Sequence, residues 1–248
     1  MTTTFSSEAV SFSQLDSERF GIRVARARIT SGNLCDVLEC CEEERVDLLI
    51  ARCATTEMAA VQKAEAYGFL LTDTLLYYQF DLQKRTIPQQ ASKFLVRSLE
   101  SGDEDQIRKI AVAAFNGYIG HYHADPRLDR RKCDDAYVSW AERSCVPGLA
   151  ADKVLVAEGD GRVIGFATLR LNSSEEVEGL LFAVAPEYQG SGVCGLFMVR
   201  GLEWTLAAGA RRMIISTQVT NISMQKVWCR LGFEPSQSFY TLHKWFDR

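Results

Sequence analysis

A glycine-rich loop between a buried strand and a helix is the feature that most constrains this chain. The stretch PEYQGSGVCG covers residues 186–195, follows the apolar run GLLFAVAP and precedes a helical pattern over 193–208. Glycine adopts positive φ angles at little cost, and the first turn of a helix has backbone N–H groups without intrahelical partners. Together with the helix dipole, these groups form a cradle for a phosphate or diphosphate. The sequence therefore predicts an anion-binding loop at this strand–helix junction.

Two standard phosphate-binding motifs do not fit this loop. A P-loop requires Gly-Lys-Ser/Thr, and the loop contains no lysine. The letters GSGVCG of residues 190–195 match a dinucleotide fingerprint, but that fingerprint belongs near the start of an alternating parallel sheet. Here the loop follows the sixth or seventh predicted strand and an antiparallel hairpin. The loop therefore requires another explanation.

The composition is typical of an ordinary soluble globular protein. Of its 248 residues, 47 % are hydrophobic and 24 % are charged, and the net charge is −4. This balance argues against nucleic-acid binding, which depends on clustered Lys and Arg. No apolar stretch approaches the roughly 20 residues of a membrane helix, and the N-terminus lacks the pattern of a secretory signal. We therefore expect a cytoplasmic protein that binds neither nucleic acid nor membrane.

The cysteines give no metal-site pattern. The eight cysteines contain no CxxC pair, and the chain has three histidines. Zinc-ligand spacing is therefore absent, and no metal is expected. A disulfide framework and a set of reduced, mostly buried thiols are both possible readings. Because no secretory signal is present, we expect reduced thiols.

Strand and helix patterns predict two domains joined by a polar linker. The N-terminal α/β domain covers residues 1–85, the linker 86–92 and the second domain 93–248. In the first domain, predicted strands at 19–29, 46–53 and 70–82 alternate with helices at 33–45 and 55–69. Thr55 or Thr56 is suited to begin the second helix, and Gly68 to end it. In the second domain, two predicted helices precede a hairpin at 154–171, whose turn signal is Gly-Asp-Gly. A strand then leads into the glycine loop, and a helix, a strand, a helix and a strand follow the loop to the end of the chain.

The two domains share one sequence echo. TTEMAAVQKAEAYGF and VTNISMQKVWCRLGF align on their Gly-Phe pairs without a gap. Each follows a short apolar strand and precedes a longer strand rich in Tyr and Phe. A chance match between two strand–helix–strand units would look the same, but we favour a degenerate structural duplicate. Because the glycine loop has no counterpart in the first domain, the chemistry is expected in the second.

The segment LLFAVAPEYQGSGVCGLFMVRGLEW resembles the central motif of the GCN5-related N-acetyltransferase (GNAT) superfamily, Gln/Arg-x-x-Gly-x-Gly/Ala after a strand. The motif runs from Gln189 to Cys194, and Cys194 stands where Gly or Ala is usual. GDGRVIGFATL and TNISMQKVWCRLGF also resemble the family's central hairpin and late helix. The resemblance covers about 93–248. It implies an α/β (α+β) GNAT fold, a mixed and mostly antiparallel central sheet flanked by helices, with a degenerate GNAT-like N-terminal domain.

The resemblance also implies acetyl-CoA, or another short acyl-CoA, as the acyl donor. In this family the loop holds the coenzyme diphosphate, and backbone groups of the preceding strand hold the pantetheine arm and polarise the thioester carbonyl. Carried over to this chain, the coenzyme-binding positions are Phe182, Val184, Gln189, Gly190, Ser191, Gly192, Val193, Cys194, Gly195, Asn221 and Trp228. Asn221 is equally suited to cap its helix, and the two roles are compatible.

The catalytic positions depart from the family pattern. A Tyr often stands seven residues after that Asn and protonates the departing thiolate, but this chain has Trp228, whose indole only donates a hydrogen bond. Tyr240 on the last strand is the candidate phenol, with core packing as the alternative. Glu178, on the same strand face as Glu176, is the candidate base, with a solvated strand end as the alternative. His121 and His123 are the other candidate bases.

A narrower resemblance concerns the acceptor. The two-domain layout and the segment AAFNGYIGHYHADPRLDRRKCDDAYVSWAERS are similar to the bacterial TDP-fucosamine acetyltransferase group, which acylates nucleotide-linked amino sugars for surface polysaccharides. This implies direct attack by the amine of a dTDP-linked amino-dideoxy sugar, with substrate contacts from Tyr118, His121, His123 and Arg127; a solvated loop is the alternative. An acetyltransferase for protein, polyamine or antibiotic amines and a non-catalytic acyl-CoA-binding module remain open. A homodimer is expected from family habit.

Overall fold

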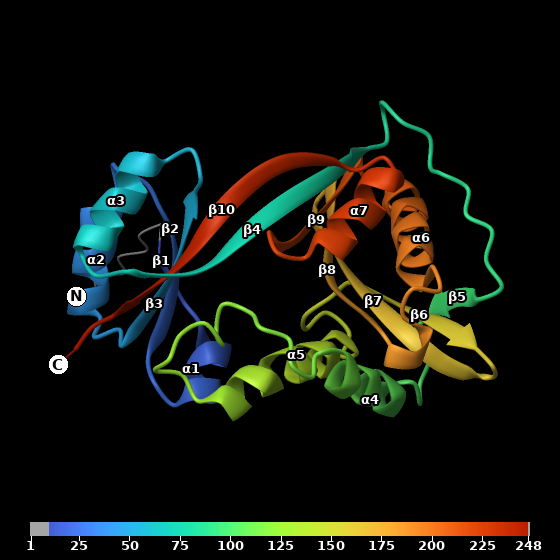
Figure 1. Ribbon diagram of the computed structural model, residues 1–248, viewed down its shortest axis with the longest axis horizontal. Helices are drawn as coiled ribbons and strands as arrows, with labels where there is room; N and C mark the ends of the chain where they lie inside the picture. Colours follow the sequence, from blue (N-terminus) through green and yellow to red (C-terminus); the bar gives the residue numbers. More distant parts are fainter. Residues whose placement is uncertain (1–9, 248) are drawn as a thin grey trace, which may run out of the picture. The chain divides into compact units, whose positions relative to one another are not determined.

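The computed structural model describes residues 10–247, which form two compact units (Figure 1). The first unit holds the residues up to Leu75, Ile119–Cys133 and the residues from Gln237 onward. The second unit holds Leu76–Tyr118 and Asp134–Ser236. The bounds of these units differ from the predicted division at residues 86–92, and the separate N-terminal domain over 1–85 stays a prediction.

Three elements contribute residues to both units. They are β4 (Leu70–Asp81), α5 (Arg130–Ser144) and β10 (Glu234–Trp245). The predicted linker lies within the second unit, between β4 and β5 (Leu95–Ser98). Among residues 10–247, no helix combines the length and the apolar character that crossing a bilayer requires.

In the first unit the strand order is β1-β2-β3-β10-β4. Strands β2 and β3 pair in parallel, whereas β1 pairs with β2, and β10 with β3, in antiparallel fashion. Buried side chains of β2, α2, β3 and α3 form one apolar core. The bounds are β1 Val10–Phe12, α1 Gln14–Phe20, β2 Val24–Ile29, α2 Leu34–Glu43, β3 Leu48–Ala54 and α3 Met58–Ala66.

The prediction of an extended segment from residue 19 is wrong at its start, because α1 continues to Phe20. The Ser13 hydroxyl caps α1 by accepting a hydrogen bond from the Asp16 N–H at 3.3 Å. Gly21 ends the helix with a φ of +71°. These are standard helix signals, and the arginine-rich alternation of the following residues concealed them.

The helices of the sequence echo end alike. Gly68 follows α3 with a φ of +76°, as predicted, and Gly232 follows α7 (Ile222–Arg230) with a φ of +92°. Each glycine leads into a strand of twelve residues, β4 or β10. At the start of α3, Glu57 occupies the N-cap position instead of Thr55 or Thr56.

The second unit has the strand order β10-β4-β9-β8-β7-β6-β5. Strands β5 to β8 form an antiparallel meander. Helix α6 connects β8 to β9, and these two strands pair in parallel. The predicted fold class, a mixed and mostly antiparallel sheet flanked by helices, is confirmed. The bounds are α4 Glu104–Ala114, β6 Lys153–Gly159, β7 Arg162–Ser173, β8 Glu176–Val184, a short 3₁₀ helix Pro186–Tyr188, α6 Val193–Ala207 and β9 Arg212–Gln218.

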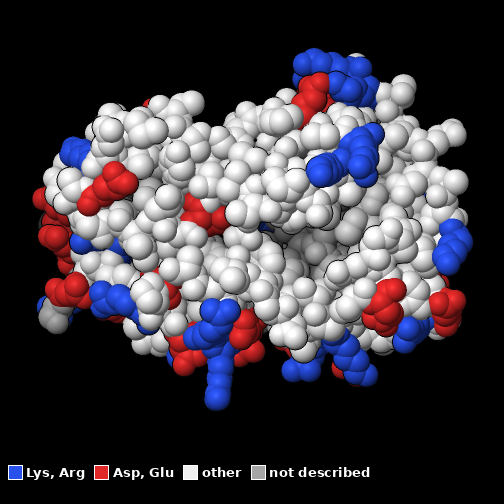
Figure 2. Space-filling view, viewed as in Figure 1, with Lys and Arg blue, Asp and Glu red and all other residues white. Residues whose placement is uncertain are grey.

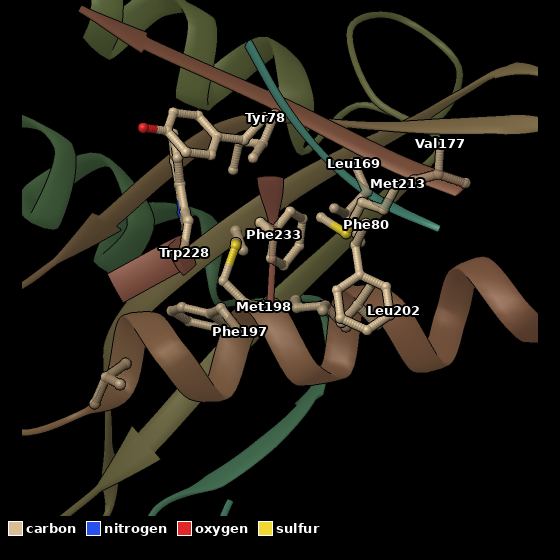
Figure 3. Packing of buried hydrophobic residues seen from close by; sticks show 14 of the residues in the cluster. Tyr78, Phe80, Leu169, Val177, Phe197, Met198, Leu202, Met213, Trp228 and Phe233 are labelled. Carbon is tan, nitrogen blue, oxygen red and sulfur yellow. The ribbon is translucent and has the colours of Figure 1, made fainter. Parts of the chain in front are cut away.

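Helices cover both faces of this sheet, so the central strands are apolar on both sides (Figure 1). Helices α4 and α5 pack on one face, against residues such as Phe166 and Leu181. Helices α6 and α7 pack on the other, where Phe197, Trp228 and Phe233 belong to one buried cluster (Figure 3). The glycine loop joins the edge of this second layer to the end of β8.

Candidate functional site

The glycine loop has the backbone conformation that an anion cradle requires. Gly190 and Gly192 adopt φ angles of +76° and +91°, in the left-handed region. Gly192 is the N-cap of α6 and offers no side chain to the helix, so the amides of Val193 and Cys194 are not capped from that position. Gly190, Ser191 and Gly192 are exposed. The loop therefore presents a helix N-terminus to the surface.

Gln90, in the predicted linker, lies against this loop. Its Nε2 donates a hydrogen bond to the Gly192 carbonyl at 3.0 Å. Its Oε1 is buried and has no partner among the described residues. A Cβ at Gly195 would lie 2.7 Å from that oxygen, which explains why glycine occupies this turn of α6. Sequence analysis missed Gln90 because a polar linker carries no periodic signal.

Strands β8 and β9 separate at their carboxyl ends. Their parallel pairing runs from Glu176–Arg212 to Gly179–Ile215, while β8 continues to Val184 and β9 to Gln218. The register of β8 against β7 shifts at the same point, so that one extra residue, Leu180, lies between two paired positions. Such a bulge bends a strand locally. The final residues of β8, including Phe182 and Val184, therefore have a backbone edge that does not pair with β9.

Gly179 sits where the strands diverge. A Cβ on Gly179 would lie 2.9 Å from the Phe182 ring and 3.0 Å from Ile215. The absence of a side chain at Gly179 therefore leaves room for the Phe182 ring at the point where β8 and β9 separate. On the other side of the loop, Gln189 Nε2 donates to the Val184 carbonyl at 3.3 Å and so ties the loop to the strand end. Figure 2 shows a hollow where Figure 1 draws β7 and β8, walled mainly by uncharged residues.

Helix α7 begins beside this opening. Asn221 is its N-cap, and its Oδ1 accepts a hydrogen bond from the Met224 N–H at 3.3 Å, as the capping interpretation predicts. Trp228 is 2 % exposed, and its Nε1–H has no acceptor among the described residues. Burying such a donor without a partner costs about 1–3 kcal/mol. An unsatisfied donor in a packed core is a candidate ligand contact.

Tyr78 packs on Trp228, and sequence analysis did not single it out. Its ring centroid lies 5.3 Å from that of the indole (Figure 3). Its hydroxyl donates to Gln225 Oε1 at 3.2 Å. Burial, with a smaller contribution from the neighbouring Cys229, raises the pKa of Tyr78 above its usual value. Tyr78 lies on β4, which sequence analysis assigned to the N-terminal domain, so its position beside α7 required the strand order.

The predicted base pairs with neighbours on its own sheet. Glu178 Oε2 and Glu176 Oε1 both accept hydrogen bonds from Asn172 Nδ2, at 3.1 Å each, so the two carboxylates share one strand face as predicted. Glu176 also pairs with Arg212 at 2.8 Å. The role of Glu178 as a base stays a prediction.

The predicted substrate and acid residues divide between the two units. Tyr118 belongs to the second unit, where it packs with Phe115 and Tyr137 in an aromatic trio. Tyr240 belongs to the first unit, pairs with Cys53 across β10 and β3, and packs against the first core. His121, His123 and Arg127 also belong to the first unit. The functional roles of these residues stay predictions.

His121, which is partly buried, ends a hydrogen-bonded chain in the first unit whose other members include the buried Asp125 and His243. Asp125 Oδ2 lies 2.7 Å from His243 Nδ1 and accepts a further hydrogen bond from Trp245 Nε1 at 2.9 Å. The other nitrogen of His243, Nε2, lies 3.0 Å from His121 Nδ1. Burial, and then the His243 and Arg26 charges, hold the pKa of His121 well below its usual 6.5. The imidazole of His121 is therefore neutral at pH 7.

The other predicted loop residues have local partners. His123 Nδ1 accepts a hydrogen bond from the Gly120 N–H at 3.1 Å. Arg127 forms an ion pair with Asp247 at 2.8 Å and stacks over the Trp245 ring at 4.1 Å. The guanidinium is about half exposed, so this ion pair is screened by solvent.

The cysteines do not cross-link the part of the chain that the structure describes. None of the eight forms a disulfide within residues 10–247; three are buried, three are partly buried and two are exposed. Burial raises the pKa of Cys194 to about 11. Beside the glycine loop, Cys194 is therefore a neutral thiol at pH 7 and a poor nucleophile.

Comparisons with known proteins agree with this geometry. A model of the acetyltransferase (GNAT) family matches residues 106–233. The chain is 29 % identical over 146 residues to the spore coat polysaccharide biosynthesis protein SpsD of Bacillus subtilis (strain 168). That match covers 59 % of this chain and 49 % of SpsD, so the chain spans about half the length of this curated relative.

Two solved structures resemble most of the chain. A conserved protein of unknown function from Staphylococcus epidermidis ATCC 12228 has a TM-score of 0.64 and 13 % identity, over 96 % of this chain and 92 % of its own. A tandem GNAT protein of the clavulanic acid biosynthesis pathway has a TM-score of 0.60 and 15 % identity, over 91 % and 76 %. These identities show the fold alone. The family match extends over more than half of the residues and includes the glycine loop, so the chain belongs to the acetyltransferase (GNAT) family.

Proposed function

We propose that the chain is an acyl-CoA-dependent N-acyltransferase. The loop Gly190–Gly192 and the first turn of α6 bind the coenzyme diphosphate through backbone N–H groups. The observation that carries this proposal is the uncapped start of α6 behind two glycines of positive φ. Membership of the GNAT family supports it, because this family uses acetyl-CoA.

The separated end of β8 supplies the second half of the coenzyme site. The pantetheine arm contains amide groups, and the backbone edge of β8 around Phe182 and Val184, which does not pair with β9, binds them as it would an added strand. One N–H of this edge donates to the thioester carbonyl oxygen and stabilises the negative charge that develops there. Asn221 and Trp228 complete the site from α7.

The reaction is direct transfer. The neutral amine attacks the thioester carbon, and coenzyme A leaves as its thiol. The raised pKa of Cys194 supports a route without a covalent intermediate on that residue. Glu178 is the proposed base for the amine, and Tyr240 the phenol that the sequence favours for the leaving thiolate.

We further propose a dTDP-linked amino-dideoxy sugar as the acceptor, bound by Tyr118, His121, His123 and Arg127 in a cytoplasmic protein. The relative SpsD is a spore coat polysaccharide biosynthesis protein, which supports sugar chemistry. In this proposal residues 1–85 form a degenerate GNAT-like domain, residues 93–248 the catalytic domain, and two chains form a homodimer. Protein, polyamine and antibiotic amines are the alternative acceptors.

A matched glycine pair tests the coenzyme site. Gly192→Ala and Gly209→Ala place a side chain at φ angles of +91° and +77°, at the two ends of α6. Each costs about 1–2 kcal/mol of backbone strain. We expect only Gly192→Ala to weaken coenzyme A binding in calorimetry, because only this glycine shapes the cradle. Equal losses in the two variants would contradict the assignment of the loop.

Thiol release tests the reaction and its acceptor. Acetyl-CoA is mixed with the protein and with dTDP-3-amino or dTDP-4-amino-dideoxy sugars, peptides or polyamines, and free thiol is followed with a thiol reagent. Release with a sugar nucleotide alone supports the proposed substrate class. Tight coenzyme binding without release from any acyl-CoA would favour a non-catalytic acyl-CoA-binding module, for which the Trp at position 228 is the supporting observation.

A further inference from the structure

The unsatisfied Trp228 N–H and the Tyr78 hydroxyl form a pair of hydrogen-bond donors on the inner side of α7. Both side chains are buried, with exposures of 2 % and 4 %. They contact each other through their rings at 5.3 Å. In Figure 3 the Tyr78 oxygen points away from the apolar cluster, and the Trp228 nitrogen lies on the same side. The pair therefore places two polar hydrogens at one margin of an otherwise apolar core.

The proton of the Tyr78 hydroxyl is held in a defined direction. Gln225 Nε2 donates to the Val219 carbonyl at 2.8 Å and to the Gln218 carbonyl at 3.4 Å, which fixes the orientation of the amide. Its Oε1 must therefore be the acceptor of the phenol proton, at 3.2 Å. This distance is long for an O–H···O bond, and the acceptor is neutral. A negatively charged acceptor would compete strongly for the same proton.

The pair shares a buried cluster with the residues at the point where β8 and β9 separate. Trp228 belongs to the buried cluster that also contains Ile215 and Phe197, and Phe182 packs against that cluster. Phe182 and Ile215 are the side chains that meet at Gly179, the last residue of β8 that pairs with β9. Trp228 and Tyr78 thus pack in the same core as the residues at which β8 parts from β9.

We propose that Tyr78, in place of the Tyr240 that the sequence favours, is the proton donor to the leaving thiolate, with Trp228 as the residue that positions it. This inference rests on the proposed N-acyltransferase function. The nitrogen of the acceptor amine forms its bond to the thioester carbon, the C–S bond breaks, and the electron pair passes to sulfur. The Tyr78 proton moves to sulfur, which gives coenzyme A thiol. Glu178, the proposed base, takes the proton that the attacking nitrogen loses, and the phenolate recovers a proton from solvent.

Three phenol-to-phenyl variants test the assignment by thiol release. Tyr78→Phe keeps the ring on Trp228 and removes the hydroxyl. We expect kcat to fall about 100-fold, the usual scale for losing a general acid, with an unchanged KM for acetyl-CoA. Tyr67→Phe, at an exposed position after α3, is the matched control and keeps full activity. Full activity of Tyr78→Phe together with a large loss in Tyr240→Phe would overturn the proposal in favour of Tyr240.

A rescue variant separates catalysis from packing. Adding Trp228→Tyr to Tyr78→Phe places a phenol at position 228, on the other side of the ring contact, while position 78 has none. We expect kcat of this double variant to be at least tenfold higher than that of Tyr78→Phe. Thermal unfolding of each variant is measured in parallel. A folded double variant as inactive as Tyr78→Phe would contradict the donor role.

A binding measurement tests the same inference without an acceptor. Coenzyme A is titrated from pH 6 to 10 on the protein, and thiolate absorbance is recorded as a difference against the analogue that lacks the sulfur atom, which cancels the protein cysteines. We expect the bound thiol pKa to be about one unit lower in the parent than in Tyr78→Phe. Equal pKa values would refute the Tyr78 inference alone. If neither ligand bound, the coenzyme site and the inference would both be rejected.

Discussion

Replacing Gly195 by Ala tests how closely Gln90 approaches α6. The added Cβ would lie 2.7 Å from Gln90 Oε1 and 3.0 Å from Nε2, so the Gln90 side chain must move. Its 3.0 Å hydrogen bond to the Gly192 carbonyl is then lost, at a cost of about 1 kcal/mol. Ala in place of a helical Gly gains up to about 1 kcal/mol. We expect the two effects to cancel, leaving the free energy of unfolding nearly unchanged.

The balance changes when Gln90 is removed first. In a Gln90→Ala background nothing opposes the new methyl group, so Gly195→Ala should raise the free energy of unfolding by about 1 kcal/mol. The double-mutant cycle then yields a coupling of about 1 kcal/mol. Urea unfolding of the four proteins, followed by circular dichroism, measures it. Gln89→Ala, at the exposed neighbouring position, is the control background and should show no coupling. An equal effect of Gly195→Ala in both the parent and Gln90→Ala would refute the contact.

Three further outcomes are expected. The Gln90→Ala variant should bind coenzyme A several-fold more tightly in calorimetry, because the diphosphate no longer has to displace the buried Gln90 amide oxygen from the start of α6. Unchanged or weaker binding would contradict this. The pKa of His121 is well below 6.5 in the folded chain, so below pH 6.5 the unfolded chain binds a proton at this residue that the folded chain does not bind. The stability associated with neutral His121 is therefore complete above pH 6.5 and declines as the pH falls below it. The free energy of unfolding should therefore fall by about 1.4 kcal/mol per pH unit below 6.5, and His121→Gln should flatten this slope. Phe197→Ala, fully buried in α6, should lower the free energy of unfolding by about 3–5 kcal/mol, whereas Leu206→Ala, 60 % exposed on the same helix, should change it by less than about 0.5 kcal/mol.

The most reliable sequence predictions concerned local backbone chemistry. The glycine loop, the Asn221 cap, the glycine after α3 and the hairpin turn at Asp160 and Gly161 all have the expected conformations. Each depends on steric freedom or a hydrogen bond within a few residues, which the letters encode directly. Two local features were missed: helix α1, whose cap signals lie beside an alternating arginine pattern, and the N-cap of α3, which is Glu57.

The assignment of residues to a site was harder to predict. Tyr78 was placed in the N-terminal domain and Tyr240 in the second, but the structure places Tyr78 beside Trp228 and places Tyr240 in the first unit. The reason is the strand order: β4 lies next to β9, and β10 lies between β3 and β4. No local pattern encodes which strands become neighbours.

The sequence by itself determined the backbone conformation of the loop, the class of the fold and the family. These properties depend on short motifs, which can be recognised from residue types and their spacing along the chain alone. Only the tertiary structure decided which phenol accompanies Trp228, which linker residue rests on the start of α6, and where β8 parts from β9. Those contacts join residues up to 150 positions apart in the chain, as with Tyr78 and Trp228, and arise from the packing of whole elements, which periodicity along the chain does not specify.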